Sequence, residues 1–259
     1  MTLLVIAPDT DGTAGRFADF ANRSGVPTVV ASEFGRVGIT VHVTRDRVCR
    51  TRITVDEVEV SGVLARGVGD WGHEPDTQRA FISAERYAAF WSAVALWPGP
   101  VVNRPTTQGF FPRLDPLELA GCGAVAPPRT VILNDGSAPG TTVYHLPSWT
   151  MADPDAPRSR FDVVQISDTD PTRARRILLA GTDTFDVSTT GKRLSEDLAD
   201  RVAPVISWLR QSGMDFADFT VELEHGVTRL LDVSCWPDHH LFPLVEERVY
   251  TALLNQLTP

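Results

Sequence analysis

The residues best suited to chemistry lie near the end of the chain, in the stretch Cys235-Trp236-Pro237-Asp238-His239-His240. Thiolate, imidazole and carboxylate groups are the ligands that zinc uses in proteins, and Asp232 lies just before this stretch. The spacing matches no compact zinc motif, however, and adjacent histidines on a loop are expected to point in different directions. A solvated loop is therefore the favoured interpretation, and a loop that faces a substrate is the alternative.

A second candidate is His145, which lies where the predicted strand TTVYHLPSW gives way to a proline turn. It could contact a phosphate, act as a catalytic base or be an inert residue at the end of a strand. A lone histidine is usually inert, so the third interpretation is favoured. No Ser/His/Asp order and no CxxC pair indicates nucleophilic or redox catalysis.

The composition excludes several classes of protein. The net charge of −9 argues against nucleic acid as the main partner. No apolar run is long enough to cross a membrane, and the first residues lack the basic segment of a signal peptide. The three cysteines are widely spaced and odd in number, which favours a reducing cytoplasm over a disulfide framework. We therefore expect a cytoplasmic protein that binds neither nucleic acid nor a membrane.

Among the basic residues there is a single lysine, Lys192, and all the others are arginines. Base composition of the genome is the simplest explanation for this bias. It nevertheless has a chemical consequence, because any mechanism that needs two lysines in one site is excluded.

The elements that must position these residues begin with a βαβ pattern. A buried strand at residues 3–7, a helix at 15–24 and a second strand at 26–31 favour a parallel sheet. Alternating apolar residues over 38–63 predict half-exposed strands, and residues 74–96 predict a helix whose aromatic residues belong to a core.

The second half of the chain predicts shorter elements. Three strands are expected to form one antiparallel sheet, and a long amphipathic helix is expected to end at Gly213. The predicted elements are, in order, a strand at 101–105, a helix at 114–121, a strand at 130–133, strands at 161–166, 176–180 and 184–187, a helix at 195–213, a hairpin at 219–223 and 229–233, and a helix at 243–257.

Three segments in order resemble the ATP-grasp superfamily, particularly the ligases that tailor ribosomal peptides or make natural-product amides. They are WPGPVVNRPTTQGFFPRLDPLELAGCGAVAPPRTVILND, FDVVQISDTDPTRARRILLAG and GMDFADFTVELEHGVTRLLDVSCWP. The resemblance implies an α/β fold with α+β lobes. Residues 1–105 would form a pre-ATP-grasp domain and residues 106–259 a reduced ATP-grasp region. That region would divide into a small central lobe, about 130–187, and a C-terminal lobe, about 188–259.

Such ligases join a carboxylate to an amine through an acyl-phosphate, with ATP and magnesium, and need cations over the transferred phosphate. The resemblance places Arg113 and His145 where the family has its two phosphate lysines. It makes Gln165 the residue that enters the adenine hinge and Arg176 an arginine that contacts the phosphate or acyl group. His145 and Arg176 would then be catalytic, whereas Arg113 and Gln165 would bind the nucleotide. Ion pairing at the surface is the alternative for both arginines.

The resemblance also locates the magnesium ligands, which need carboxylate and amide oxygens. They fall on Thr220, Asp232 and Ser234, of which only Asp232 is a carboxylate. Asp232 is the best metal candidate, with an exposed acid near a turn as its alternative. Glu222, on the same face of its strand as Thr220, could replace a lost ligand, but a solvent-facing side chain is expected.

The loop that follows these ligands lines the acceptor pocket in the family, so the resemblance makes Asp238, His239 and His240 candidates for substrate binding. Three functions stay open. The first is an ATP-dependent ligase that couples a carboxylate to an amine or hydroxyl. The second is a degenerate relative that uses no ATP and binds a peptide or a partner biosynthetic enzyme. The third is an ATP-independent enzyme built on His145, Asp232 and the loop. The cofactors are ATP and Mg²⁺ in the first case and none in the others, and a homodimer is an open alternative.

Overall fold

The computed structural model describes most of the two larger sheets and their helices. The described residues are 2–32, 34–43, 45, 49–67, 77–106, 130–133, 143–145, 150–151, 162–166, 174–188, 192–224 and 227–259. The helix predicted at 114–121 lies outside them. Among the helices of the described part, none is long and apolar enough to cross a membrane.

The N-terminal part is a six-stranded sheet with the order β2-β1-β5-β4-β3, and β6 pairs with β5. Its elements are β1 (Thr2–Ile6), α1 (Gly12–Arg23), β2 (Thr28–Ala31), β3 (Val37–Val43), β4 (Cys49–Val55), β5 (Val58–Ala65), α2 (Thr77–Leu96) and β6 (Val101–Val102). β1 runs parallel to β2 and β5, which confirms the predicted βαβ opening. Every residue of β1 is buried, as is typical of a parallel strand that is covered on both faces.

The C-terminal part is a five-stranded antiparallel sheet with the order β13-β12-β11-β14-β15. Its elements are β11 (Ala174–Ala180), β12 (Asp183–Asp186), β13 (Lys192–Arg193), α4 (Glu196–Gln211), β14 (Phe216–Glu224), β15 (Val227–Ser234), the short 3-10 helix η3 (His239–Leu241) and α5 (Glu246–Leu257). Ser195 caps α4 by accepting a bond from the Leu198 backbone. Gly213 follows this helix with φ +80°, the left-handed conformation expected after a helix end.

A separate four-stranded sheet has the order β7-β10-β8-β9. Its strands are β7 (Thr130–Leu133), β8 (Val143–His145), β9 (Thr150–Met151) and β10 (Asp162–Ile166). The expectation that the strands near 161–166, 176–180 and 184–187 share one sheet is therefore wrong. β10 pairs with β7 and β8, whereas β11 pairs with β12 and β14, because apolar alternation indicates a strand but does not specify its partner. The lobe boundaries at 105 and 187 stay predictions.

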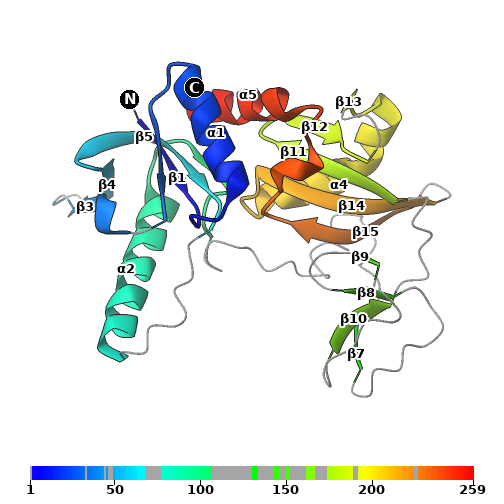
Figure 1. Cartoon of the computed structure of the whole chain (residues 1–259), viewed down its shortest axis with the longest axis horizontal. Helices are drawn as coiled ribbons and strands as arrows, with labels where there is room; N and C mark the ends of the chain where they lie inside the picture. The colour runs from blue at the N-terminus through cyan, green and yellow to red at the C-terminus, as the bar shows by residue number, and fades with distance from the viewer. Residues whose placement is uncertain are drawn as a thin grey trace.

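Two hydrophobic clusters cover opposite faces of the C-terminal sheet. On one face, Ile177 and Phe219 pack against α4 residues such as Val205. On the other face, Leu178 and Phe216 belong to a cluster that also contains β1, α1 and α5 side chains. Figure 1 shows α5 between the two sheets. This second cluster therefore joins the N-terminal and C-terminal parts through one core.

Candidate functional site

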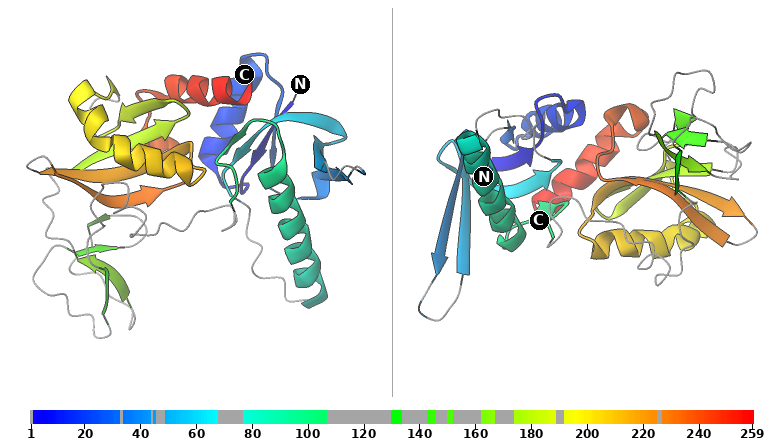
Figure 2. Two further views of the ribbon diagram at one scale, coloured as in Figure 1. Left: turned by 180° about the vertical axis from the view of Figure 1, so that it is seen from behind. Right: turned by 90° about the horizontal axis from the view of Figure 1, so that it is seen from below.

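Residues on one face of the C-terminal sheet change from apolar to polar along β11 and β14. Side chains alternate across a strand, so Leu178 shares its face with Arg176, and Phe216 shares its face with Asp218 and Thr220. The apolar end of this face is buried in the core that contains α5. Figure 2, right, shows α4 on one side of the β14–β15 hairpin and the four-stranded sheet on the other. The polar end of the face opposite α4 is the candidate site.

Arg176, the predicted phosphate contact, is held in an ion pair with Asp218. Its Nη2 and Nε lie 2.6 Å and 2.7 Å from Asp218 Oδ2. The Asp218 side chain is only 2% exposed, whereas that of Arg176 is 34% exposed. Burial raises the pKa of the Asp218 carboxyl, and the Arg176 charge offsets part of this shift. Arg176 therefore neutralises a buried carboxylate, whereas the sequence offered only a surface ion pair as the alternative to phosphate contact.

The predicted magnesium positions do come together on this face. Thr220 in β14 pairs with Asp232 in β15, and Asp218 pairs with Ser234. The register shifts directly after the Thr220 pair, so Leu231 is an extra residue, and both Leu230 and Leu231 are buried. Such a bulge changes the direction of neighbouring side chains, which sequence alternation alone does not predict.

The expectation that Glu222 faces solvent is wrong. This residue is only 3% exposed, and its Oε2 lies 3.4 Å from Nη1 of Arg229, the residue directly opposite in β15. A carboxylate that is buried beside an arginine gains stability from the pairing, whereas an unpaired one would be costly to bury. Glu222 is therefore committed to an ion pair on the sheet.

The predicted magnesium positions on this face carry a single carboxylate, Asp232, and the neighbouring Arg176 is already paired with an acid. Magnesium is usually held by one or two carboxylates together with phosphates, and Asp218 is already paired with a cation. Asp232 is half-buried and remains the carboxylate at the predicted position, while the Ser234 hydroxyl accepts a bond from the Trp236 backbone at 3.1 Å. The predicted magnesium positions thus offer one carboxylate, that of Asp232, beside the hydroxyls of Thr220 and Ser234.

The other predicted nucleotide residues lie in the four-stranded sheet or outside the described residues. His145, in β8, pairs with Val164 and Thr150 across its two neighbours. Gln165, in β10, pairs with Tyr144 and with Thr130 of β7. Arg113 lies outside the described part of the chain. The roles assigned to all three residues stay predictions.

Lys192, the single lysine, lies in β13 at the edge of the C-terminal sheet, where it pairs with Asp186. Three strands separate β13 from β15, the strand that carries Asp232. The strand that carries the lysine is therefore at the opposite edge of the sheet from β15.

Asn103, whose role sequence reasoning missed, connects the two larger sheets. It follows β6 with φ +58° and is 5% exposed. Its Oδ1 accepts bonds from the backbone of Phe216 (2.8 Å) and Asp215 (3.0 Å), and its Nδ2 donates to Phe216 O (2.8 Å). Asparagine tolerates this left-handed conformation better than most residues. The residue type alone therefore does not predict the role of Asn103, because the turn after β6 must be known first.

Arg66, at the end of β5, makes a second connection. Its Nε lies 2.8 Å from Oδ2 of Asp11, the N-cap of α1, and its Nη2 donates to Pro237 O at 3.0 Å. The guanidinium also lies over the Phe216 ring, 5.3 Å from its centroid. Polar groups at the carboxyl ends of parallel strands often mark a ligand site. Asp11 follows β1 and Arg66 follows the parallel strand β5, so the sequence already placed these two residues at the same edge of the sheet.

The segment after β15 is held against α1. The Thr13 hydroxyl donates to Pro237 O at 3.2 Å and accepts a bond from the His239 backbone at 2.9 Å. The expectation that the adjacent histidines diverge is wrong, because their ring centroids are 3.9 Å apart within η3. Burial raises the pKa of the Cys235 thiol to about 11, so this group is protonated at neutral pH.

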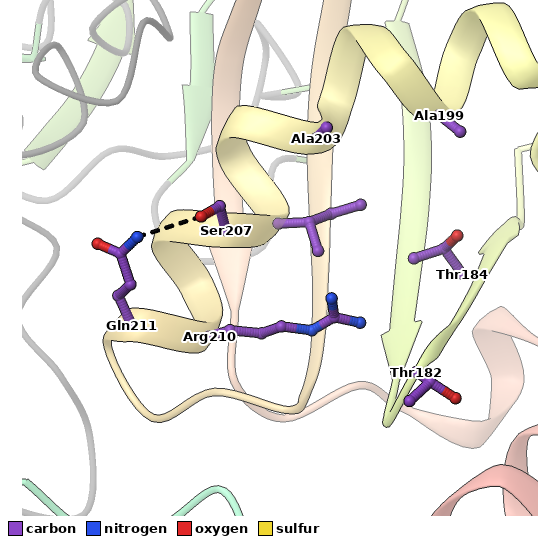
Figure 3. Close-up of a pocket in the computed structure, with 8 residues that line it drawn as sticks. Thr182, Thr184, Ala199, Ala203, Ser207, Arg210 and Gln211 are labelled. Carbon is purple, nitrogen blue, oxygen red and sulfur yellow. Dashed lines mark hydrogen bonds between the residues drawn. The ribbon is translucent and has the colours of Figure 1, made fainter.

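A groove of about 420 Å³ lies elsewhere, between α4 and β12 (Figure 3). Its polar side chains are already engaged in part, since Arg210 donates to Gly181 O at 3.0 Å and Gln211 to Ser207 at 3.1 Å. None of the predicted site residues lines it. It lies on the α4 side of the sheet, away from the polar face.

The chain is similar to solved structures of ATP-grasp ligases over almost its entire length. The macrocyclase MdnC from Microcystis aeruginosa MRC, bound with precursor peptide MdnA, aligns with a TM-score of 0.61 at 13% identity and covers 98% of this chain and 100% of its own. The ATP-grasp ligase PsnB, complexed with precursor peptide PsnA2 and AMPPNP, aligns with a TM-score of 0.65 at 13% identity, covering 99% and 98%.

A third structure is a RiPP-associated ATP-grasp ligase from Chryseobacterium gregarium in complex with ADP and a leader and core peptide. It aligns with a TM-score of 0.59 at 12% identity and covers 99% of this chain and 96% of its own. No protein-family model and no curated protein matches the sequence. The chain has the ATP-grasp fold, which confirms the resemblance found in the sequence.

Proposed function

We propose that this protein binds a precursor peptide in ribosomal-peptide biosynthesis, on an ATP-grasp fold that does not use ATP. The observation that carries the proposal is the ion pair between Arg176 and the buried Asp218, at 2.6 Å. A phosphate that bound Arg176 would compete with Asp218 for the guanidinium and would bring a second negative charge beside a carboxylate that is already costly to bury.

Two further features support the loss of ATP chemistry. Phosphoryl transfer needs cations over the phosphate, and the single lysine, Lys192, lies at the far edge of the sheet. The predicted magnesium positions provide one carboxylate, Asp232, paired with Thr220. In this proposal the polar face contributes to peptide binding without a bound nucleotide.

The peptide part of the proposal is supported by the structural neighbours, since MdnC, PsnB and the Chryseobacterium ligase were each solved with a peptide. In this proposal the protein is a binding subunit that holds the peptide for a partner biosynthetic enzyme. The exposed Trp236, 48% accessible beside the Asp238–His240 loop, provides an aromatic surface that a peptide could cover.

Fluorescence anisotropy with labelled peptides encoded beside its gene tests this function. We expect an affinity in the micromolar range that does not change when ATP and Mg²⁺ are added, and a Trp236→Ala variant should weaken it. Mass spectrometry of the same mixtures should show unmodified peptide.

Either of two results would contradict the proposal. Peptide that loses one water per turnover in the presence of ATP would make the protein a ligase, because carboxylate–amine coupling expels water. Failure of every encoded peptide to bind would remove the peptide-binding role.

A further inference from the structure

We propose that Asp238, His239 and His240 form a binding site for a divalent transition metal, with Zn²⁺ as the probe ion. One ligand atom from each of these residues lies within 4.8 Å of the others. Imidazole nitrogens and a carboxylate oxygen are ligands that zinc uses, and three protein ligands leave one coordination position open. The proposal does not depend on the peptide function, because metal binding is measured without peptide or nucleotide.

The distance between the first two ligand atoms matches shared coordination. His239 Nδ1 lies 3.3 Å from Asp238 Oδ1, yet this buried nitrogen makes no hydrogen bond among the described residues. Two atoms that are each about 2.1 Å from zinc at a tetrahedral angle lie about 3.4 Å apart. The two atoms are therefore spaced as two ligands of one tetrahedral ion.

The third ligand is close and able to adjust. The ring centroids of His239 and His240 are 3.9 Å apart at an interplanar angle of 37°. The His240 side chain is exposed, so rotation of its ring can bring a nitrogen to a shared ion at little cost. Asp238 is also exposed, and its Oδ1, which accepts the His240 backbone bond at 2.8 Å, has a second lone pair for the ion.

The backbone of the loop is already fixed, which lowers the entropy cost of binding an ion. Thr13 holds both Pro237 O and the His239 backbone. The His239 ring packs closely against Gly12, which has no side chain, because a methyl group on Gly12 would lie 2.8 Å from His239 Cε1. The nearby Cys235 is not part of the cluster.

Titration of Zn²⁺ against a chromophoric chelator, with untagged protein at neutral pH, tests the site. We expect one equivalent of zinc to bind, and a rise in the melting temperature on zinc addition. The His240→Ala and Asp238→Asn variants should each weaken binding by at least about tenfold, since changes in a metal shell commonly cost 10–100-fold. His42→Ala, at an exposed histidine of β3, is the matched control and should bind zinc as the unaltered protein does.

Gly12→Ala provides a second and independent variant, because it keeps all three ligands and only displaces the His239 ring. It should also weaken zinc binding. Equal zinc affinity in the His240→Ala, Asp238→Asn and His42→Ala variants would overturn the proposal, as it would show nonspecific surface binding. Absence of any stoichiometric zinc binding to the unaltered protein would overturn it as well.

Discussion

Replacing Arg176 by methionine is expected to lower the free energy of unfolding by about 3 kcal/mol at neutral pH, because it leaves Asp218 charged and unpaired in the interior. This value is at the low end for a buried pair, since the Arg176 side chain is 34% exposed. Chemical denaturation followed by circular dichroism measures the change. Arg193→Met is the matched control in the same sheet, where the partner is the more exposed Asp183, and should cost less than about 1 kcal/mol.

The pH dependence of the same variant follows from the Asp218 pKa. Burial raises this pKa in the folded protein, and loss of Arg176 raises it further. A folded-state pKa above the unfolded value means that the folded protein takes up a proton more readily, so lowering the pH relieves the cost. The deficit of Arg176→Met should therefore be largest at neutral pH and shrink as the solution is acidified toward the Asp218 pKa. Adding Asp218→Asn should recover part of the lost stability at neutral pH.

A small effect of Arg176→Met would contradict this account of the polar face. It would mean that Asp218 does not depend on the arginine and that Arg176 is available to bind an anion. The stability of this one variant thus separates a structural ion pair from a phosphate contact.

Replacing Asn103 by alanine should have the second large effect, a loss of about 4 kcal/mol of unfolding free energy. The variant leaves buried backbone groups of Phe216 and Asp215 without partners, each worth about 1–3 kcal/mol, and places alanine at φ +58°. Thermal and chemical denaturation measure the loss. Asn103→Gly removes the same bonds but suits the left-handed conformation, so it should cost about 1 kcal/mol less than alanine.

Asn22→Ala is the matched control for this prediction. Asn22 also bonds to one backbone residue through both ends of its amide, with Thr28 N at 2.9 Å and Thr28 O at 3.2 Å. The Asn22 side chain is exposed and lies in α1, where alanine is a good helix former, so the loss should be about 1 kcal/mol. If Asn103→Ala and Asn22→Ala lowered the free energy of unfolding equally, the Asn103 bonds between the two sheets would contribute little to stability.

The parts of the fold that depend on local pattern could be predicted from the sequence. The βαβ opening and α4 follow from apolar periodicity, and Gly213 marks a helix end by chemistry confined to a few residues. Strand pairing could not be predicted, because it depends on contacts between distant segments. The strand predicted at 161–166 accordingly belongs to another sheet than the one expected for it.

In the candidate site, too, some features could be predicted from the sequence and others depend on contacts between distant residues. The family resemblance assigns Thr220, Asp232 and Ser234 to magnesium, and the structure adds that Thr220 pairs with Asp232 across β14 and β15. The motif did not reveal the partner of Arg176, because Asp218 looks like any acid in an alternating strand until its burial is known. The two histidine rings of η3 are expected to diverge, because a 3-10 turn separates consecutive side chains by about 120°, and only their side-chain torsions bring the ring centroids to 3.9 Å.

The ATP-grasp fold by itself does not establish what this chain does. The same fold carries ligases that were solved with nucleotide and peptide together. In this chain the polar face is held by internal ion pairs, Arg176 with Asp218 and Arg229 with Glu222. Function depends on the site and not on the fold, so likeness in architecture alone does not imply phosphoryl transfer.

Isothermal titration calorimetry with ATP and Mg²⁺ tests the central claim most directly, with PsnB, which was solved with AMPPNP, as the positive control under the same conditions. We predict no binding of ATP to this protein up to millimolar concentrations, in folded samples that were verified by circular dichroism. Saturable binding in the micromolar range would contradict the account and would mean that a rebuilt nucleotide site operates on the polar face.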